Sequence, residues 1–121
     1  ELIAAALRHE PLRTTPGEQT RDLLFIDDAV AGLVAAAGAA ARTAPAFNLG
    51  TGTAPAVREI VAEIRKLTGH TGTWEPTVPY RADEVMDYRL EPARAAAGLG
   101  WRATVAWREG LARTVAAREQ G

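Results

Sequence analysis

Several residue types that often carry chemistry are missing from this chain of 121 residues. It contains no cysteine, which excludes disulfide bonds and thiolate catalysis. It contains no serine, which excludes a serine-based catalytic triad. The two histidines, His9 and His70, are far apart in the sequence and belong to no cluster of ligands, so we expect no histidine metal site.

Long apolar runs and an excess of charge of one sign are also missing. No window approaches the roughly 18 consecutive apolar residues of a membrane span, and no leader-like segment opens the chain. The formal net charge is −1, which gives no electrostatic footprint for nucleic acid or for an anionic membrane. We therefore expect a cytoplasmic protein with no metal, no nucleic-acid partner and no membrane partner.

What the chain does contain is enough apolar side chain for one core, because 47% of its residues are hydrophobic. Its length predicts one domain at most, or a piece of one. Helical periodicity predicts helices over residues 1–9, 29–41, 57–68, about 92–98 and about 107–118. Short apolar runs predict strands at 22–26 and 46–49, and residues 70–90 are expected to be irregular. Strands alternating with helices indicate an α/β fold.

The predicted helix at 29–41 is apolar on nearly every side, which is typical of a helix buried by its neighbours. Asp27 and Asp28 stand just before it, where a helix start needs acceptors for its free N–H groups. Two predicted strands are too few for an independent sheet, so this helix requires a partner sheet from elsewhere. The chain also begins at Glu1 inside a predicted helix, as an excised fragment would.

Two catalytic arrangements can be tested directly on the sequence. Gly50-Thr51-Gly52 supplies two glycines of a dinucleotide-binding turn, but Pro55 stands where the third is needed, so an ordinary turn is the better interpretation. Short-chain oxidoreductases pass protons through a tyrosine and a lysine one helical turn apart. This pair is absent here, because the only lysine, Lys66, has Ala62 and not tyrosine four residues before it. No catalytic residue is predicted in this chain.

What remains is arginine beside short polar loops. Arg21 and Arg81 each carry a guanidinium fork that can hold a phosphate through two parallel hydrogen bonds, and Glu84 could accept both hydroxyls of a ribose. Together they would suit a nucleoside diphosphate. The alternative is that these arginines are solvated, with Arg21 paired to Asp22 or Asp28 on the surface.

Four segments, in order, resemble extended short-chain dehydrogenases/reductases that act on nucleotide sugars, the NAD-dependent epimerases and dehydratases. The segments are TRDLLFIDDAVAGLVAA at 20–36, AFNLGTGTAPAVREIVAEI at 46–64, RADEV at 81–85 and LEPARAAAGLGWRATVAWREGLARTV at 90–115. They span almost the whole chain, and they resemble the carboxy-terminal portion of such enzymes. The chain departs from the family where Ala82-Asp83 replaces Pro-Gly, which leaves the shape of that loop open.

The resemblance implies a role for each matching residue. It places Arg21 and Arg81 on the pyrophosphate and Glu84 on the ribose hydroxyls. It places the loop at Thr14 and Thr15 along the nucleobase, and Tyr88 facing the sugar.

The resemblance also implies a domain organisation. Residues 1–121 would form the carboxy-terminal nucleotide-sugar-binding region, with about 22–50 belonging to the cofactor-binding lobe, and the amino-terminal dinucleotide-binding region would be absent. The intact parent would hold NAD or NADP, act on a UDP-, dTDP- or similar sugar and be a homodimer, while this chain alone would bind no cofactor and have no activity. The alternative is a non-catalytic module that binds or senses a sugar nucleotide, or a subunit that completes another chain's sheet.

Overall fold

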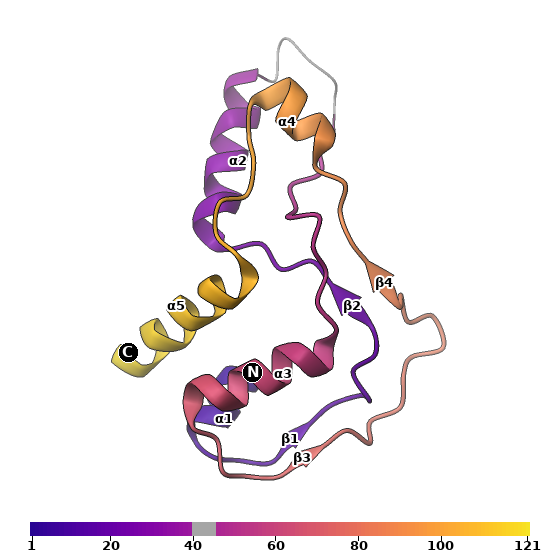
Figure 1. Cartoon of the computed structure of the whole chain (residues 1–121), viewed down its shortest axis with the longest axis vertical. Helices are drawn as coiled ribbons and strands as arrows, with labels where there is room; N and C mark the ends of the chain where they lie inside the picture. Colours follow the sequence, from indigo (N-terminus) through magenta and orange to yellow (C-terminus); the bar gives the residue numbers. More distant parts are fainter. Residues whose placement is uncertain (40–45) are drawn as a thin grey trace. The chain divides into compact units, whose positions relative to one another are not determined.

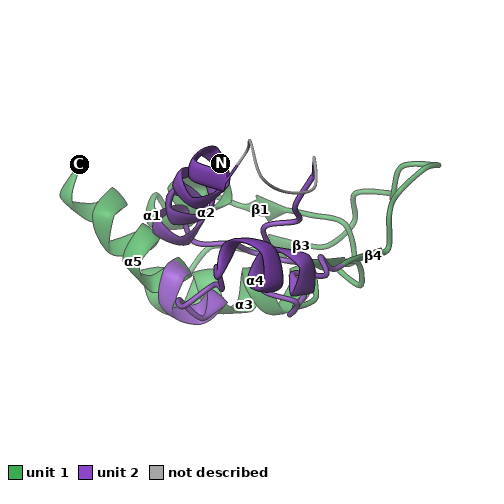
Figure 2. Cartoon of the chain, turned by 90° about the horizontal axis from the view of Figure 1, so that it is seen from above, with its two compact units in different colours: residues 1–21, 55–88, 111–121 green, residues 22–54, 89–110 purple. Residues whose placement is uncertain are grey.

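The structure, a computed structural model, describes residues 1–39 and 46–121 (Figure 1). These residues form two compact units, coloured separately in Figure 2. Unit 1 consists of residues 1–21, 55–88 and 111–121, and unit 2 of residues 22–54 and 89–110. Each unit is therefore built from segments that are distant in the sequence.

Unit 1 combines helices with four two-residue strands. Its elements are α1 (Leu2–Leu7), β1 (Leu12–Arg13), β2 (Thr20–Arg21), α3 (Val57–Thr68), β3 (Trp74–Glu75), β4 (Asp87–Tyr88) and, from Leu111 onward, α5 (Trp107–Gln120). β1 pairs with β3, and β2 pairs with β4, both in parallel. The β2–β4 ladder sets Arg21 opposite Tyr88.

The core of unit 1 lies where α1, α3 and β1 meet. Ala6, Leu12, Val61 and Ile64 are buried there, and partly buried apolar side chains surround them. Helix α3 is amphipathic, so the burial of its apolar face stabilises it more than its intrinsic helix propensity does. Gly69 ends α3 in the left-handed conformation, and its N–H bonds the carbonyls of the last turn.

Unit 2 contains α2 (Ile26–Ala39), α4 (Ala93–Leu99) and the first turn of α5. Gly32 in α2 permits a close approach, because a Cβ at this position would lie 2.7 Å from the Leu49 side chain. The Trp101 indole N–H donates to the Asp28 carbonyl over 2.9 Å. These contacts fix one face of α2.

The Asp28 side chain corrects a prediction about the start of this helix. α2 begins at Ile26, so Asp27 and Asp28 lie inside its first turn and not before it. The Asp28 carboxylate accepts hydrogen bonds from the Thr104 N–H, the Thr104 hydroxyl and the Val105 N–H, at 2.8 to 3.0 Å. The Asp28 carboxylate therefore binds the loop at residues 104–105, which lies beside the buried face of α2.

The opposite face of α2 is exposed, which agrees with the prediction that this helix requires a partner sheet from elsewhere to bury it. Ile26, Val30, Leu33 and Val34 are 50–67% exposed, while Asp28 and Gly32 are buried. The exposed residues follow an i, i+4, i+7, i+8 spacing and form one stripe, which we call the apolar stripe. Unit 2 contains no strand among its described residues, so no sheet of this unit covers the stripe. Positions 40 and 41 of the predicted helix lie outside the described residues.

The predicted helices are otherwise confirmed, whereas the predicted strands are wrong. Residues 22–25 and 46–49 form no strand in the part of the chain that the structure describes. Two strands, β3 and β4, instead form inside the segment 70–90 that was expected to be irregular. No described helix has the length and hydropathy needed to cross a membrane.

Candidate functional site

Four of the six predicted site residues line one cavity of unit 1. This cavity, of about 280 Å³, is lined by Arg21, Arg81, Asp83, Glu84, Val85 and Tyr88, and we call it the arginine cavity. β2 supplies the first of these residues, the 81–85 loop the middle four and β4 the last. The β2–β4 register brings the two ends of this set together.

Arg21 is held firmly in place by three acceptors. Its Nη1 donates to the carbonyls of Thr20 and Val85, at 2.7 Å each, and its Nη2 donates to a carboxylate oxygen of Glu84. The two charged side chains are 30% and 16% exposed. The alternative that Arg21 pairs with Asp22 or Asp28 is therefore wrong, and two guanidinium N–H groups remain beyond these three bonds.

Arg81 differs from Arg21 because its guanidinium makes no hydrogen bond or ion pair with any residue that the structure describes. Only its backbone carbonyl is engaged, by the Glu84 N–H at 3.1 Å, in the turn that shapes the loop. The arginine cavity thus contains one fixed and one unpaired guanidinium. An anion entering it would meet the unpaired charge first.

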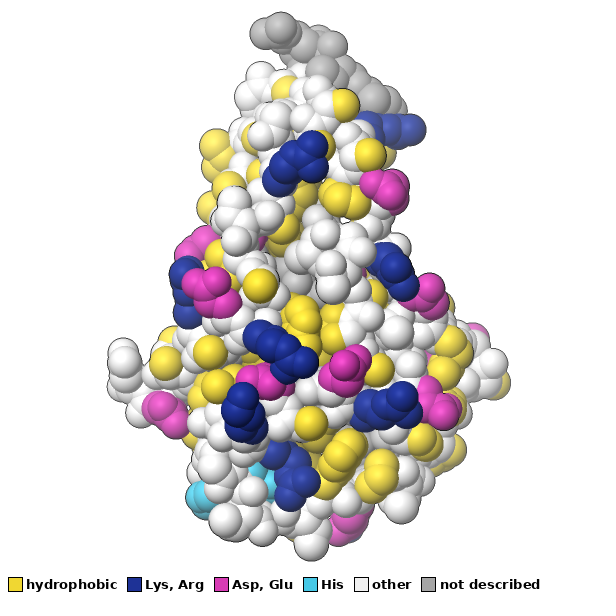
Figure 3. Space-filling model, viewed as in Figure 1, with side chains coloured by type: hydrophobic (Ala, Val, Ile, Leu, Met, Phe, Trp, Pro, Cys, Tyr) yellow, Lys and Arg dark blue, Asp and Glu magenta, His cyan; other side chains and the backbone are white. Residues whose placement is uncertain are grey.

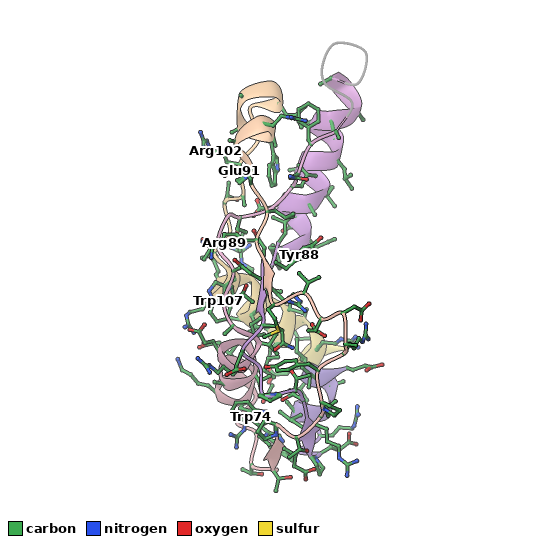
Figure 4. All side chains as sticks on the ribbon, turned by 90° about the vertical axis from the view of Figure 1, so that its right-hand side faces the viewer. Trp74, Tyr88, Arg89, Glu91, Arg102 and Trp107 are labelled. Atoms are coloured by element: carbon green, nitrogen blue, oxygen red, sulfur yellow. The ribbon has the colours of Figure 1, made fainter. Side chains whose placement is uncertain are left out.

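The arginine cavity also contains an exposed aromatic ring. Tyr88 is 50% exposed at the end of β4, and Figure 4 labels it there. Its backbone N–H bonds the Thr20 hydroxyl over 3.3 Å, which ties β4 to β2. The phenol leaves room for a flat or polyhydroxylated group to lie against it.

The other two predicted residues, Thr14 and Thr15, line a second cavity of unit 1. This space of about 580 Å³ is lined by α1, β1 and the loop that follows, and we call it the threonine cavity. Thr14 is buried, and its hydroxyl accepts from the Trp74 indole N–H at 2.9 Å and donates to the Thr15 carbonyl at 2.8 Å. The Thr14 side chain thus shapes the wall, while Thr15 remains the residue open to a ligand.

Gln19 lines the threonine cavity and was not predicted. Arg21, two residues later, lines the arginine cavity. The sequence carries no signal for Gln19, since a single polar residue before a strand is unremarkable.

The prediction for the glycine turn concerns another part of the chain. The Gly50-Thr51-Gly52 segment is an ordinary turn, as predicted, because Asp22 accepts the N–H groups of Thr51 and Gly52 over 2.9 Å each. A phosphate would need these same donors.

The two histidines are close in space despite their separation in sequence. The rings of His9 and His70 stack, with centroids 6.2 Å apart. Among the residues that the structure describes, no three histidine, cysteine or acidic side chains gather as metal ligands would. On the face drawn in Figure 3, acidic and basic side chains are interspersed, in keeping with the small net charge.

Comparison with known proteins gives the family context of this geometry. No family model matches the chain. A UDP-glucose 4-epimerase from Mycolicibacterium smegmatis is 39% identical over 100 residues, which cover 82% of this chain. An epimerase from Methanothermobacter thermautotrophicus superposes over 98% of this chain, with a TM-score of 0.90 and 30% identity.

The chain belongs to the extended short-chain dehydrogenase/reductase family. Its α/β architecture corresponds to the carboxy-terminal portion of these epimerase folds. MoeE5, solved in complex with UDP-glucose and NAD, matches 99% of the chain, with a TM-score of 0.85 and 31% identity. The relatives are longer, since the chain spans 31% of the curated epimerase, and 36% and 41% of the two solved chains.

Proposed function

We propose that this chain is the nucleoside-diphosphate-binding part of an NAD(P)-dependent nucleotide-sugar epimerase, dehydratase or reductase. The observation that carries this proposal is the arginine cavity, where a fixed and an unpaired guanidinium share a wall. A solved relative also supports the proposal, because MoeE5 was solved in complex with UDP-glucose and NAD. A cytoplasmic location and a homodimeric parent remain predictions.

In this proposal the substrate lies along β2 and spans both cavities. Arg81 and the remaining N–H groups of Arg21 bind the pyrophosphate, because charge-assisted hydrogen bonds to phosphate are strong and directional. Glu84 holds Arg21 through one oxygen, which leaves its second oxygen for a ribose hydroxyl. The base lies in the threonine cavity against Thr15, and the sugar extends toward Tyr88.

The nicotinamide cofactor requires a different site. The glycine turn at 50–52 does not fit a dinucleotide, because Asp22 already accepts its N–H groups. NAD or NADP would therefore bind to a region that the longer relatives have and this chain does not span. This chain's residues would bind and orient the substrate, while the cofactor supplies the hydride chemistry.

The apolar stripe indicates where such a region would contact this chain. Its four side chains project from one face of α2 and expose apolar surface that a sheet or helix layer could bury. On this basis we propose that the described residues of the segment at about 22–50 belong structurally to the cofactor-binding lobe. The stripe would then become buried once that lobe is present.

A second candidate, a non-catalytic module that binds or senses a sugar nucleotide, is favoured by the missing tyrosine–lysine pair. The Tyr80 phenol accepts the Glu18 N–H over 3.0 Å and has Glu84, not lysine, four residues later. In both candidates the isolated chain binds nucleotide and turns over no UDP- or dTDP-hexose with added NAD. A genomic reading frame that continues upstream and encodes the glycine-rich turn and the tyrosine–lysine pair separates the enzyme from the module.

Titration calorimetry of the 121-residue chain with UDP, uridine and inorganic pyrophosphate tests the binding role. We expect UDP to bind more tightly than either fragment, because it contacts both cavities at once. Exposed Arg102 lines neither cavity, so Arg102→Ala is the matched control for changes at Arg81. Absence of UDP binding by the parent chain would refute the proposed function.

A further inference from the structure

Gln19 is buried in a way that the fold alone does not explain. The residue is 6% exposed, and its side-chain carbonyl oxygen, Oε1, is buried without a hydrogen-bond partner among the residues that the structure describes. A buried polar group without a partner destabilises a fold, because its lost hydration is not replaced. The fold would be at least as stable with an apolar side chain of the same size, which points to a role in binding.

The one side-chain bond that Gln19 makes is directional. Its Nε2 donates to the Thr15 hydroxyl oxygen over 2.7 Å. Because that oxygen accepts from Gln19, the hydroxyl proton of Thr15 must point away from Gln19. No described residue accepts this proton, and Thr15 lines the threonine cavity. The cavity wall therefore presents a hydrogen-bond donor.

A second chain of hydrogen bonds fixes the backbone of the same residue. The Trp74 indole N–H, which can only donate, bonds the Thr14 hydroxyl, and that hydroxyl in turn donates to the Thr15 carbonyl. Thr15 is thus restrained on its backbone by Thr14 and on its side chain by Gln19. Such restraint from both sides is what a binding group needs to discriminate between ligands.

We infer that Gln19 sets the base preference of the threonine cavity by orienting the Thr15 hydroxyl as a donor to the carbonyl at C4 of a pyrimidine base. This inference rests on the proposed function. Uracil and thymine carry a carbonyl at the exocyclic position where cytosine carries an amino group. The donor favours the carbonyl and leaves the amino group unpaired, so the cavity selects UDP or dTDP over CDP.

Gln19 acts in this way as a positioning residue, and its substitutions have distinct consequences. Gln19→Leu removes the donor that fixes Thr15, so UDP affinity should fall roughly three- to tenfold, the effect of one neutral hydrogen bond. Stability in urea should be unchanged or higher, because the unpartnered carbonyl is gone. Thr15→Val should weaken UDP binding similarly, while Thr15→Ser, which retains the hydroxyl, should bind as the parent does.

Gln19→Glu reverses the direction of the hydrogen bond between residue 19 and the Thr15 hydroxyl. A carboxylate can only accept, so the Thr15 hydroxyl would donate to it and present its lone pairs to the ligand. The ratio of UDP to CDP affinity should therefore drop, which a purely structural role for Gln19 would not produce. If Gln19→Glu fails to fold, Gln19→Leu and the two Thr15 variants still decide the matter.

The experiment measures UDP and CDP binding to the parent chain and to these variants by titration calorimetry, with urea unfolding in parallel. We expect the parent to prefer UDP, and the double variant Gln19→Leu/Thr15→Val to lose no more than either single variant. Equal binding of UDP by parent and Gln19→Leu, or equal or tighter binding of CDP by the parent, overturns this inference and leaves the proposed function intact. A parent that binds neither nucleotide overturns both.

Discussion

Replacing each cavity arginine by alanine should separate a binding role from a structural one. Arg81 is exposed and has no partner among the described side chains, so Arg81→Ala should change the free energy of unfolding by no more than about 0.5 kcal/mol. If Arg81 binds the pyrophosphate, the same substitution removes a charge-assisted bond of about 1.5–3 kcal/mol. UDP affinity should then fall roughly ten- to hundredfold.

Arg21→Ala should affect both quantities. It removes two bonds to backbone carbonyls and leaves Glu84, whose side chain is 16% exposed, without its cation. That pair lies between an exposed one, worth under about 1 kcal/mol, and a buried one, whose disruption costs about 3–5 kcal/mol. We expect a loss of about 2 kcal/mol of stability, and Arg21→Lys should recover only part, because an ammonium cannot make the planar contact.

Urea unfolding and titration calorimetry with UDP, applied to both variants and to the Arg102→Ala control, measure these effects. The reasoning fails if Arg81→Ala binds UDP as tightly as the control does. It fails also if Arg21→Ala is as stable as the parent, because the three bonds of Arg21 would then contribute nothing.

The remaining predictions concern stability and association. Leu33→Gln, in the apolar stripe, should reduce self-association of the isolated chain in sedimentation experiments, whereas Ala31→Gln, exposed on α2 outside the stripe, should not. Asp28→Ala should lower the free energy of unfolding by about 3 kcal/mol, because three donors lose a buried carboxylate; an unchanged urea midpoint would contradict this. The hydrogen bond from Arg8 lowers the pKa of Glu10. This pair therefore stabilises the fold at pH values above the ordinary glutamate pKa of about 4.3, and the stabilisation is lost as the pH falls through the lowered pKa. Arg8→Ala should raise the Glu10 pKa in an NMR titration.

The sequence predicts those elements whose signals are local. The helix at 57–68 is found at its predicted bounds, because apolar residues recur at helical spacing and Gly69 adopts the left-handed turn that ends it. The ladder of β1 and β3 could not be predicted in this way. Leu12-Arg13 and Trp74-Glu75 are two residues each, too short for any periodicity, and they pair across more than sixty residues.

The same distinction applies to the candidate site. Resemblance to the family selected Arg21 and Arg81, and the structure places both in one cavity. The alternative in which Arg21 pairs with Asp22 or Asp28 is wrong because both carboxylates are already used: Asp22 binds the glycine turn and Asp28 binds residues 104–105. Glu84 takes their place, brought in by the long-range pairing of β2 with β4.

The parallel ladders also affect the order in which unit 1 can form during synthesis. The ribosome releases β1 and β2 first, but their partners β3 and β4 emerge more than sixty residues later, and the α5 residues Leu111 and Val115 last. Domains generally fold as units while the chain emerges, so residues 1–21 must wait, unpaired, until residues 74–88 have emerged. A nascent chain stalled before residue 74 would leave the edges of β1 and β2 unpaired and open to pairing with another chain.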